Sequence, residues 1–221
     1  PSVSEPTLVD WLKQKEISLS TISGEERHGI VHRLDKGTSG VMVVAKTNEA
    51  HVGLSRQLED KSMGRIYLAI TDLPLKESQI IEGPIARNPN NRLKMGIVPH
   101  GKQAKSAFLK LDLSKNEKYE LVSAKLFTGR THQIRVHLSS VNRHILGDNL
   151  YGFKGELNKI NRVYLHAYNL YLIHPITNKK MDFTADIPDD MNEFLEKHFN
   201  MESINEKIDK NDIINSFSSF C

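Results

Sequence analysis

The chain of 221 residues has a single cysteine, Cys221, at its last position. One cysteine cannot form an internal disulfide, and it offers no second thiolate for a structural zinc site. The ten histidines show no His-Glu-x-x-His spacing, which excludes the usual zinc-hydrolase helix. We therefore expect a reduced protein that binds no metal, and its expected location is the cytoplasm.

Long apolar runs and a strong charge bias are also missing. No stretch approaches the roughly 18 apolar residues that suggest a membrane span, so no membrane partner is expected. Lys and Arg number 30 against 27 Asp and Glu, a formal net charge of +3. This balance excludes an overall basic nucleic-acid binder but permits RNA binding through a local patch. A hydrophobic fraction of 38% is ordinary for a globular domain with a real core.

The most informative stretch is 29–45. It consists of an apolar run, the tetrapeptide His32-Arg33-Leu34-Asp35, a turn rich in Gly, Thr and Ser, and a second apolar run. Gly37 and Gly40 supply turn conformations that other residues resist, so the pattern predicts a strand, a tight loop and a strand. Asp35 lies where the first strand meets the loop. Such an aspartate either caps the backbone amides of its own turn or presents a carboxylate on a rigid support.

The rest of the chain alternates irregularly between helix and strand patterns, without internal repeats. This order predicts an α+β fold with a mostly antiparallel sheet and flanking helices. We expect one domain over 1–199, followed by a polar, frayed tail over 200–221. The expected helices are 7–12, 47–59, 131–141 and one starting near 188, and the expected strands are 65–70, 105–113, 118–127, 163–173 and 181–184.

Segment 83–101 has the Gly, Pro and Asn content of a loop. Four cations lie in or just after it: Arg87, Arg92, Lys94 and Lys102. Two interpretations are open for this segment. It is either the solvated tip of a hairpin or a contact to the RNA backbone.

Two motifs in this sequence resemble those of the RluA/RluD-type pseudouridine synthase family. The first is His32-Arg33-Leu34-Asp35-Lys36-Gly37-Thr38-Ser39-Gly40, and the second is Thr128-Gly129-Arg130-Thr131-His132-Gln133-Ile134-Arg135-Val136-His137. They occur in the family's order, and the resemblance runs from about residue 7 to about residue 194. It implies the pseudouridine synthase fold over 1–199, without the family's usual N-terminal strand or any S4-like domain. The activity it implies is isomerisation of uridine to pseudouridine in RNA.

The resemblance also implies roles for catalytic residues. Asp35 is at the position of the family's catalytic aspartate, and carboxylates act as covalent nucleophiles in glycosyl chemistry elsewhere. Arg135 is at the position of the cation that keeps this carboxylate ionised. Tyr67 matches the tyrosine that stacks on the target base. From the residues alone, Arg135 also fits an exposed helix position and Tyr67 an ordinary strand position.

Further residues are implied as substrate contacts. Arg33 is the expected wedge that fills the space left by a flipped-out uridine, at a cost of a few kcal/mol for unstacking. Leu165 resembles the apolar residue that lines the uracil pocket. His32 ranks below Arg33 as a contact to RNA. Arg130 and Gln133 either orient the second motif or touch phosphate.

The reaction oxidises nothing and loses no group, so no cofactor is expected. The expected partner is large-subunit ribosomal RNA, with transfer RNA as the alternative, and the protein is expected to be a monomer. A competing hypothesis is a non-catalytic RNA-binding assembly factor of the same fold. A hydrolase is disfavoured because the chain has no Gly-x-Ser-x-Gly motif and no suitable second acidic partner for Asp35.

Overall fold

The computed structural model describes residues 6–15, 17–24, 27–152 and 160–220. The chain divides into two compact units. Unit 1 comprises Pro1–Arg33, Met42–Met63 and Tyr171–Asp182, and unit 2 comprises Leu34–Val41, Gly64–Leu170 and Phe183–Cys221. A single catalytic domain over 1–199 stays a prediction. None of the helices in the described ranges is both long and apolar enough to cross a membrane.

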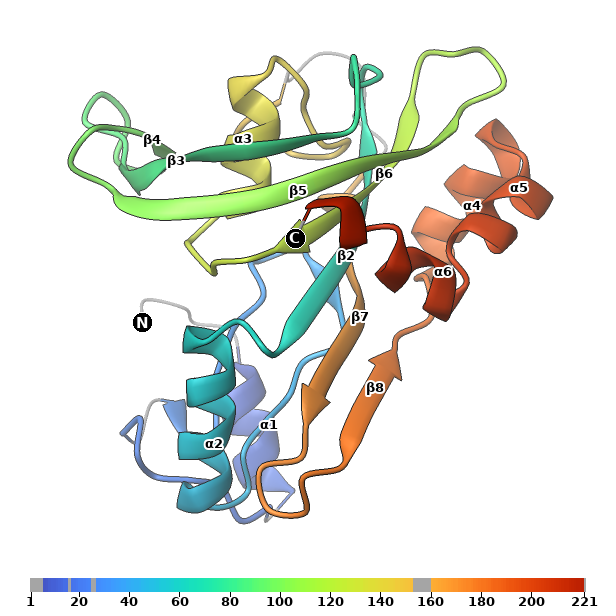
Figure 1. Cartoon of the computed structure of the whole chain (residues 1–221). Coiled ribbons are helices and arrows are strands. Elements are labelled where there is room, and N and C mark those ends of the chain that lie inside the picture. The colour runs from blue at the N-terminus through green and yellow to red at the C-terminus, as the bar shows by residue number, and fades with distance from the viewer. Residues whose placement is uncertain (1–5, 16, 25–26, 153–159, 221) are drawn as a thin grey trace. The chain divides into compact units, whose positions relative to one another are not determined.

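The fold is α+β, as predicted, and is built on one sheet in which the strands run in the order β1-β7-β2-β6-β5-β3-β4, with β8 paired to β7 (Figure 1). The pairings of β2 with β6, β6 with β5, β5 with β3 and β3 with β4 are antiparallel, and the short β1 pairs with β7 in parallel. The strands are β1 Ser39–Gly40, β2 Gly64–Thr71, β3 Gln79–Arg87, β4 Met95–Ile97, β5 Lys102–Leu113, β6 Glu120–Leu126, β7 Leu165–Ile173 and β8 Lys180–Thr184.

Burial in the middle of the sheet explains its sequence. All eight residues of β2 and the first five of β6 are buried. A strand covered on both faces reads as a nearly continuous apolar run rather than as an alternating one, and β2 has this character. The strand predicted over 118–127 is confirmed, and both faces of its first part are covered. These two central strands give the site described below a rigid support.

Helix α3, Gln133–Ser140, lies against the part of the sheet formed by β3, β4 and β5 (Figure 1). Val136 of the helix is buried with Ile85 of β3 and Ala104 of β5. Burying an aliphatic side chain of this size contributes about 1.5–3 kcal/mol. The predicted helix over 131–141 is therefore confirmed in its central part, and its apolar contacts fix which residues face the sheet.

Unit 1 contains α1, Leu8–Gln14, and α2, Asn48–Glu59. Both helices begin at a capping threonine: Thr7 accepts a hydrogen bond from the Asp10 amide, and Thr47 accepts one from the Ala50 amide. The predicted helix over 47–59 is confirmed.

Two local predictions are wrong. Residues 29–45 do not form two strands: an isolated bridge joins Ile30 and Val44, and only Ser39–Gly40 pairs with β7. The prediction of a loop over 83–101 is the second error. Strands β3 and β4 form a hairpin that occupies much of this segment. Pro84 tolerates a strand position here because it accepts a hydrogen bond from the Val98 amide through its carbonyl, and its missing N–H is not needed.

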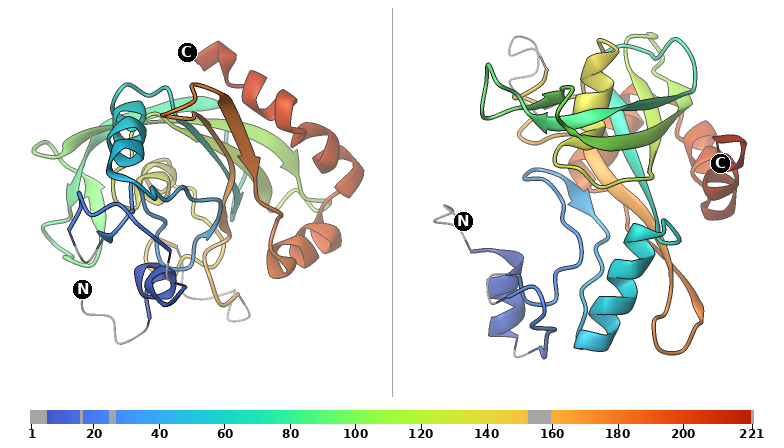
Figure 2. Two further views of the ribbon diagram at one scale, coloured as in Figure 1. Left: turned by 90° about the horizontal axis from the view of Figure 1, so that it is seen from below. Right: turned by 60° about the vertical axis from the view of Figure 1, so that its left-hand side comes forward.

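The prediction of a frayed tail over 200–221 is also wrong. After α4, Asp189–His198, the chain forms α5, Met201–Lys207, α6, Lys210–Asn215, and a 3₁₀ turn at Ser218–Phe220 (Figure 2). The sparse apolar residues of this segment are spaced to reach one buried side: Ile204, Ile213 and Phe217 have no exposed surface. Overall polarity concealed this pattern, because the segment buries one narrow apolar face and exposes the rest.

Replacing Phe217 tests whether the C-terminal helices belong to the core. Phe217→Ala removes a fully buried ring, and we expect a loss of about 3–5 kcal/mol in the free energy of unfolding, measured by urea denaturation. Phe183→Ala is the matched control, because the Phe183 side chain is 40% exposed and its loss should change stability by about 0.5 kcal/mol or less. Equal effects of the two substitutions would contradict the packing of this segment.

Candidate active site

Asp35 lies in a tight turn, in which the Thr38 amide donates to the Asp35 carbonyl at 2.9 Å. Gly37 and Gly40 have φ values of +83° and +121°, so the predicted need for glycine is confirmed. At Gly40 a Cβ would lie 2.2 Å from the Ala167 carbonyl oxygen. Only glycine therefore allows this loop to pair with β7.

The Asp35 carboxylate is mostly buried and lies near the guanidinium of Arg135. It makes no hydrogen bond to any residue within the described ranges, so the alternative of a self-capping turn aspartate does not hold there. Its side chain is 16% exposed, and its charged neighbour is Arg135, with Nη1 at 3.6 Å from Oδ2. A carboxylate that the described residues leave without a hydrogen bond is suited to react with a ligand.

The loop after Asp35 is fastened by a polar network. Ser39 Oγ accepts a hydrogen bond from Arg162 Nη1 at 3.1 Å and lies 2.9 Å from His166 Nδ1. Arg162 also forms a two-point ion pair with Asp190, at 2.7 and 2.8 Å. The network joins the Asp35 loop to β7 and to the start of α4.

Arg135 is buried on α3 and binds two carboxylates. Its Nε and Nη2 donate to Asp148 at 2.7 and 2.8 Å, and the Asp148 side chain has no exposed surface. Burial disfavours the charged guanidinium, but the hydrogen bonds and charge of Asp148, together with Asp35, outweigh burial and raise the pKa of Arg135. The helix places this cation inside, which removes the alternative of an exposed surface arginine.

Tyr151 completes the surroundings of Arg135. The guanidinium carbon lies 5.0 Å from the centre of the Tyr151 ring, within the range of a cation–π contact. The Tyr151 hydroxyl accepts a hydrogen bond from the Met95 amide at 2.7 Å and lies 2.9 Å from His132 Nδ1. Burial raises the pKa of Tyr151 to about 12, so the phenol stays neutral. This tyrosine links strand β4 to the arginine of α3.

Tyr67 and Leu165 lie on β2 and β7, which are neighbours in the sheet. Both side chains are buried. Burial raises the pKa of Tyr67; Arg65 opposes this effect and the charge of Asp35 adds to it. Tyr67 therefore lies within electrostatic range of Asp35 and is a neutral phenol. Leu165 is a buried apolar side chain on the adjacent strand.

Gln133 uses its whole hydrogen-bonding capacity inside the protein. Its Oε1 accepts from Thr128 Oγ1 and from the Arg130 amide, and its Nε2 donates to the Lys105 carbonyl and to Ser106 Oγ. Of the two roles left open for Gln133, this geometry favours orientation of the second motif over contact with phosphate. The Arg130 side chain is exposed, with Nε donating to the Gln103 carbonyl at 3.1 Å.

His32 and Arg33 belong to unit 1. His32 Nε2 accepts a hydrogen bond from the Val43 amide at 3.1 Å, which gives this histidine a structural role within its unit. Arg33 is exposed.

Sequence reasoning missed Asp148, the closest partner of Arg135. Its Oδ1 accepts hydrogen bonds from the Leu150 and Tyr151 amides, as an ordinary turn aspartate does. No spacing rule links it to an arginine 13 residues earlier. Tyr151 was missed for the same reason, since its partners come from β4 and α3.

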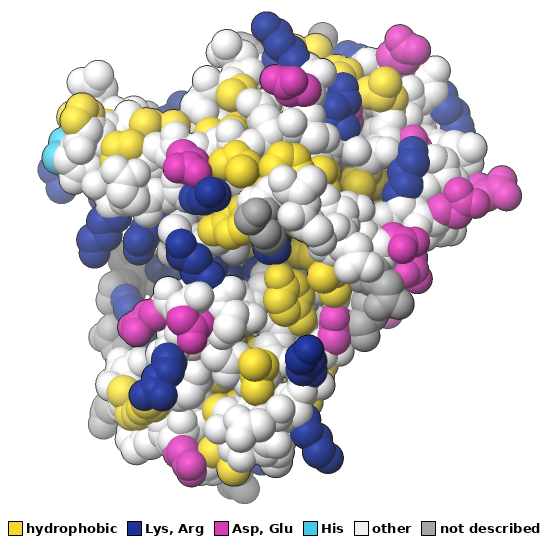
Figure 3. Space-filling view, in the orientation of Figure 1, with side chains coloured by type: hydrophobic (Ala, Val, Ile, Leu, Met, Phe, Trp, Pro, Cys, Tyr) yellow, Lys and Arg dark blue, Asp and Glu magenta, His cyan; other side chains and the backbone are white. Residues whose placement is uncertain are grey.

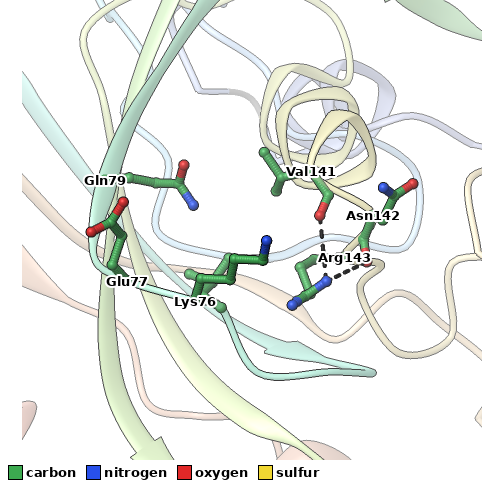
Figure 4. Close-up of a pocket in the computed structure, with 7 residues that line it drawn as sticks. Lys76, Glu77, Gln79, Val141, Asn142 and Arg143 are labelled. Atoms are coloured by element: carbon green, nitrogen blue, oxygen red, sulfur yellow. Dashed lines mark hydrogen bonds between the residues drawn. The ribbon is translucent and has the colours of Figure 1, made fainter.

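A pocket of about 300 Å³ lies elsewhere in unit 2 (Figure 4). Lys76, Gln79 and Arg143 are among its lining residues, and none of the predicted site residues is. Two of the Arg143 hydrogen bonds go to the Val141 and Asn142 carbonyls. No group of three or more potential metal ligands occurs among the residues that the structure describes.

The comparisons with known proteins agree with the resemblance of the two motifs. A family model described as RNA pseudouridylate synthase matches residues 1–140. A Helicobacter pylori strain J99 protein named "Uncharacterized RNA pseudouridine synthase" is 49% identical over 223 residues, covering 98% of this chain and 68% of that protein. A Zymomonas mobilis protein named ribosomal large subunit pseudouridine synthase D is 44% identical over 182 residues, covering 78% of this chain and 57% of that protein. The solved structure of human RNA pseudouridylate synthase domain containing 1 is similar with a TM-score of 0.67 and 25% identity, covering 81% of this chain and 74% of that one.

The buried ion pair of Arg135 can be compared with an exposed pair of the same geometry. Asp148→Ala leaves Arg135 with only the more distant Asp35, and we expect a loss of about 3–5 kcal/mol in the free energy of unfolding. Asp190→Ala breaks the two-point pair with Arg162, but the Asp190 side chain is 48% exposed, so a loss of about 1 kcal/mol or less is expected. Urea denaturation of both variants checks the contrast, and similar losses would contradict it.

His137 predicts a pH dependence of stability. Burial lowers the pKa of His137 to about 4, whereas an unfolded histidine titrates near about 6.5. Between these values the unfolded state binds more protons, so the stability contribution is fully present above about pH 6.5 and is lost as the pH falls towards 4. Urea denaturation at several pH values should show the advantage of the native protein over His137→Asn shrinking on acidification. A constant difference would contradict the lowered pKa, because the other histidines are common to both proteins.

Proposed function

The chain belongs to the RNA pseudouridylate synthase family and is an isomerase that acts on RNA; from this premise we propose that it isomerises a uridine of large-subunit ribosomal RNA, with Asp35 as the reacting carboxylate. The observation that carries the proposal is the Asp35 carboxylate itself. It is free of hydrogen bonds to the described residues, lies 3.6 Å from a buried guanidinium and is within electrostatic range of Tyr67.

The isomerisation breaks the N1–C1′ bond of uridine and forms a C5–C1′ bond. C5 loses a proton and N1 gains one, so atoms and electrons balance without an oxidant. Attack by Asp35 on C1′, attack on C6 and removal of a sugar proton are three routes to this outcome. Each of them needs an ionised carboxylate, and the Arg135 guanidinium lies 3.6 Å from Asp35 Oδ2.

Tyr67 and Leu165 are proposed to hold the uracil. A phenol that burial keeps neutral can stack on the base and share a proton with it without adding a second negative charge beside Asp35. Leu165, buried on the neighbouring strand, offers an apolar surface to a detached ring. Retention of the detached uracil in such a site prevents its loss before the new bond forms.

Arg33 is proposed as the residue that braces the RNA when the uridine leaves the stack. It is exposed and precedes Asp35 by two residues. A guanidinium is planar and cationic, so it can stack on a neighbouring base and still attract phosphate.

Ribosomal RNA as substrate is supported by the name of the Zymomonas mobilis relative. RNA binding in general is supported by the end of the sheet where β3, β4 and β5 meet, at which Lys and Arg side chains gather (Figure 3). We propose that four residues at this end of the sheet contact the RNA backbone: Arg87, Arg92, Lys94 and Lys102.

Replacing the proposed carboxylate tests the chemistry. Asp35→Asn keeps the size of the side chain but removes the charge, and we expect turnover to be abolished with RNA binding largely retained. Tritium release from [5-³H]uridine-labelled large-subunit ribosomal RNA and transfer RNA measures the reaction, and filter binding measures affinity.

Release from ribosomal RNA by the native protein alone is the expected result. Turnover by Asp35→Asn would end the assignment of this carboxylate. Release from transfer RNA alone would keep the reaction and overturn the substrate.

A further inference from the structure

Arg65 is a second buried arginine in unit 2, and its surroundings differ from those of Arg135. It lies on β2 with 8% of its surface exposed. Its Nε has no hydrogen-bond partner, and no carboxylate among the described residues forms an ion pair with it. The Arg65 guanidinium is therefore largely buried, its Nε–H has no acceptor, and no carboxylate of the described residues balances its charge.

Arg65 differs from Arg135 in that no carboxylate of the described residues compensates its charge. Arg135 satisfies its buried charge with Asp148 and Asp35, and its pKa is raised. Burial lowers the pKa of Arg65, and the group that opposes this effect is Tyr67, which is itself neutral at physiological pH. An unpaired buried charge destabilises a fold, so a position that keeps one calls for a compensating anion.

Arg65 lies on the sheet face that carries the candidate site. Residues two apart on a strand point to the same face, so Arg65 and Tyr67 are neighbours there. The guanidinium lies beside Gly129 of the second motif, where a Cβ would be 3.0 Å from Nη1. The absence of a side chain at Gly129 thus leaves room for the head group of Arg65 next to Tyr67.

We propose that Arg65 binds an anionic oxygen of the RNA substrate at the reacting nucleotide. Two sources have this chemistry: a phosphate next to the target uridine, and a uracil carbonyl oxygen that gains negative charge when the N1–C1′ bond breaks. The planar fork of donors suits either. This inference rests on the proposed function for the identity of the nucleotide, but the unpaired cation is a property of the free protein.

The first measurement needs no RNA. Arg65→Met keeps most of the side-chain volume and removes the unpaired charge, so its Tm should equal or exceed that of the native protein. Arg135→Met is the matched control. It leaves Asp148 buried without its cation, and its Tm should fall. A fall in Tm for Arg65→Met comparable to that of Arg135→Met would overturn the proposal, since Arg65 would then be a structural residue.

The second measurement identifies the oxygen. Binding of an unmodified large-subunit ribosomal RNA transcript is measured over a range of salt concentrations, and single-turnover tritium release is measured at saturating protein. If Arg65 binds phosphate, Arg65→Met weakens binding and reduces the slope of log K against log salt by about 0.7. If it binds the uracil oxygen, affinity is unchanged and the single-turnover rate falls by about tenfold or more, as expected when a charge-assisted hydrogen bond is lost.

Unchanged affinity, salt slope and rate in a stable Arg65→Met protein would overturn the proposal. Failure of the proposed function looks different, because the native protein itself would then release no tritium from ribosomal RNA. In that case the salt dependence of RNA binding tests the role of Arg65 by itself. An unchanged slope in Arg65→Met would overturn that role.

Discussion

The ion pair between Arg135 and Asp148 is the interaction on which the site depends. A guanidinium is planar, so two of its nitrogens held by one buried carboxylate fix the direction of the third. In this chain Nε and Nη2 are bound to Asp148, and Nη1 is left facing Asp35 at 3.6 Å. The protein thereby presents a positive charge to Asp35 without occupying the oxygens of its carboxylate. Asp148 thus orients Arg135 and also compensates its buried charge.

The sheet supplies the second constraint. Asp35 is not on a strand, but its loop is pressed onto β7 where Gly40 meets Ala167, and Ser39 ties the same loop to Arg162 and His166. A loop fixed in this way has the precision of a strand while its side chain remains accessible. Such an arrangement agrees with the general tendency of reactive groups to lie on loops held by rigid scaffolds.

The two buried arginines of unit 2 illustrate two ways of using a charge. The charge of Arg135 is compensated inside the protein by Asp148 and Asp35. The charge of Arg65 is not compensated by a carboxylate of the described residues, and its proposed partner is an anionic oxygen of the substrate. A fold that retains such a group gives up some stability for recognition, a compromise that is typical of functional sites.

The sequence by itself determined the α+β class, most strands and helices, and the two motifs that contain Asp35 and Arg135. Local hydrophobic periodicity and glycine-rich turns indicate the class and the elements, whereas the motifs are identified by their resemblance to a known family. Only the tertiary structure decided that Asp148 and Tyr151 surround Arg135, that Gln133 is fully used in holding its own motif, and that residues 201–220 are helical. These features depend on contacts between segments far apart in the chain, or on burial of a few apolar residues in a polar stretch. Neither leaves a local pattern, because the partner that gives each residue its role lies elsewhere in the sequence.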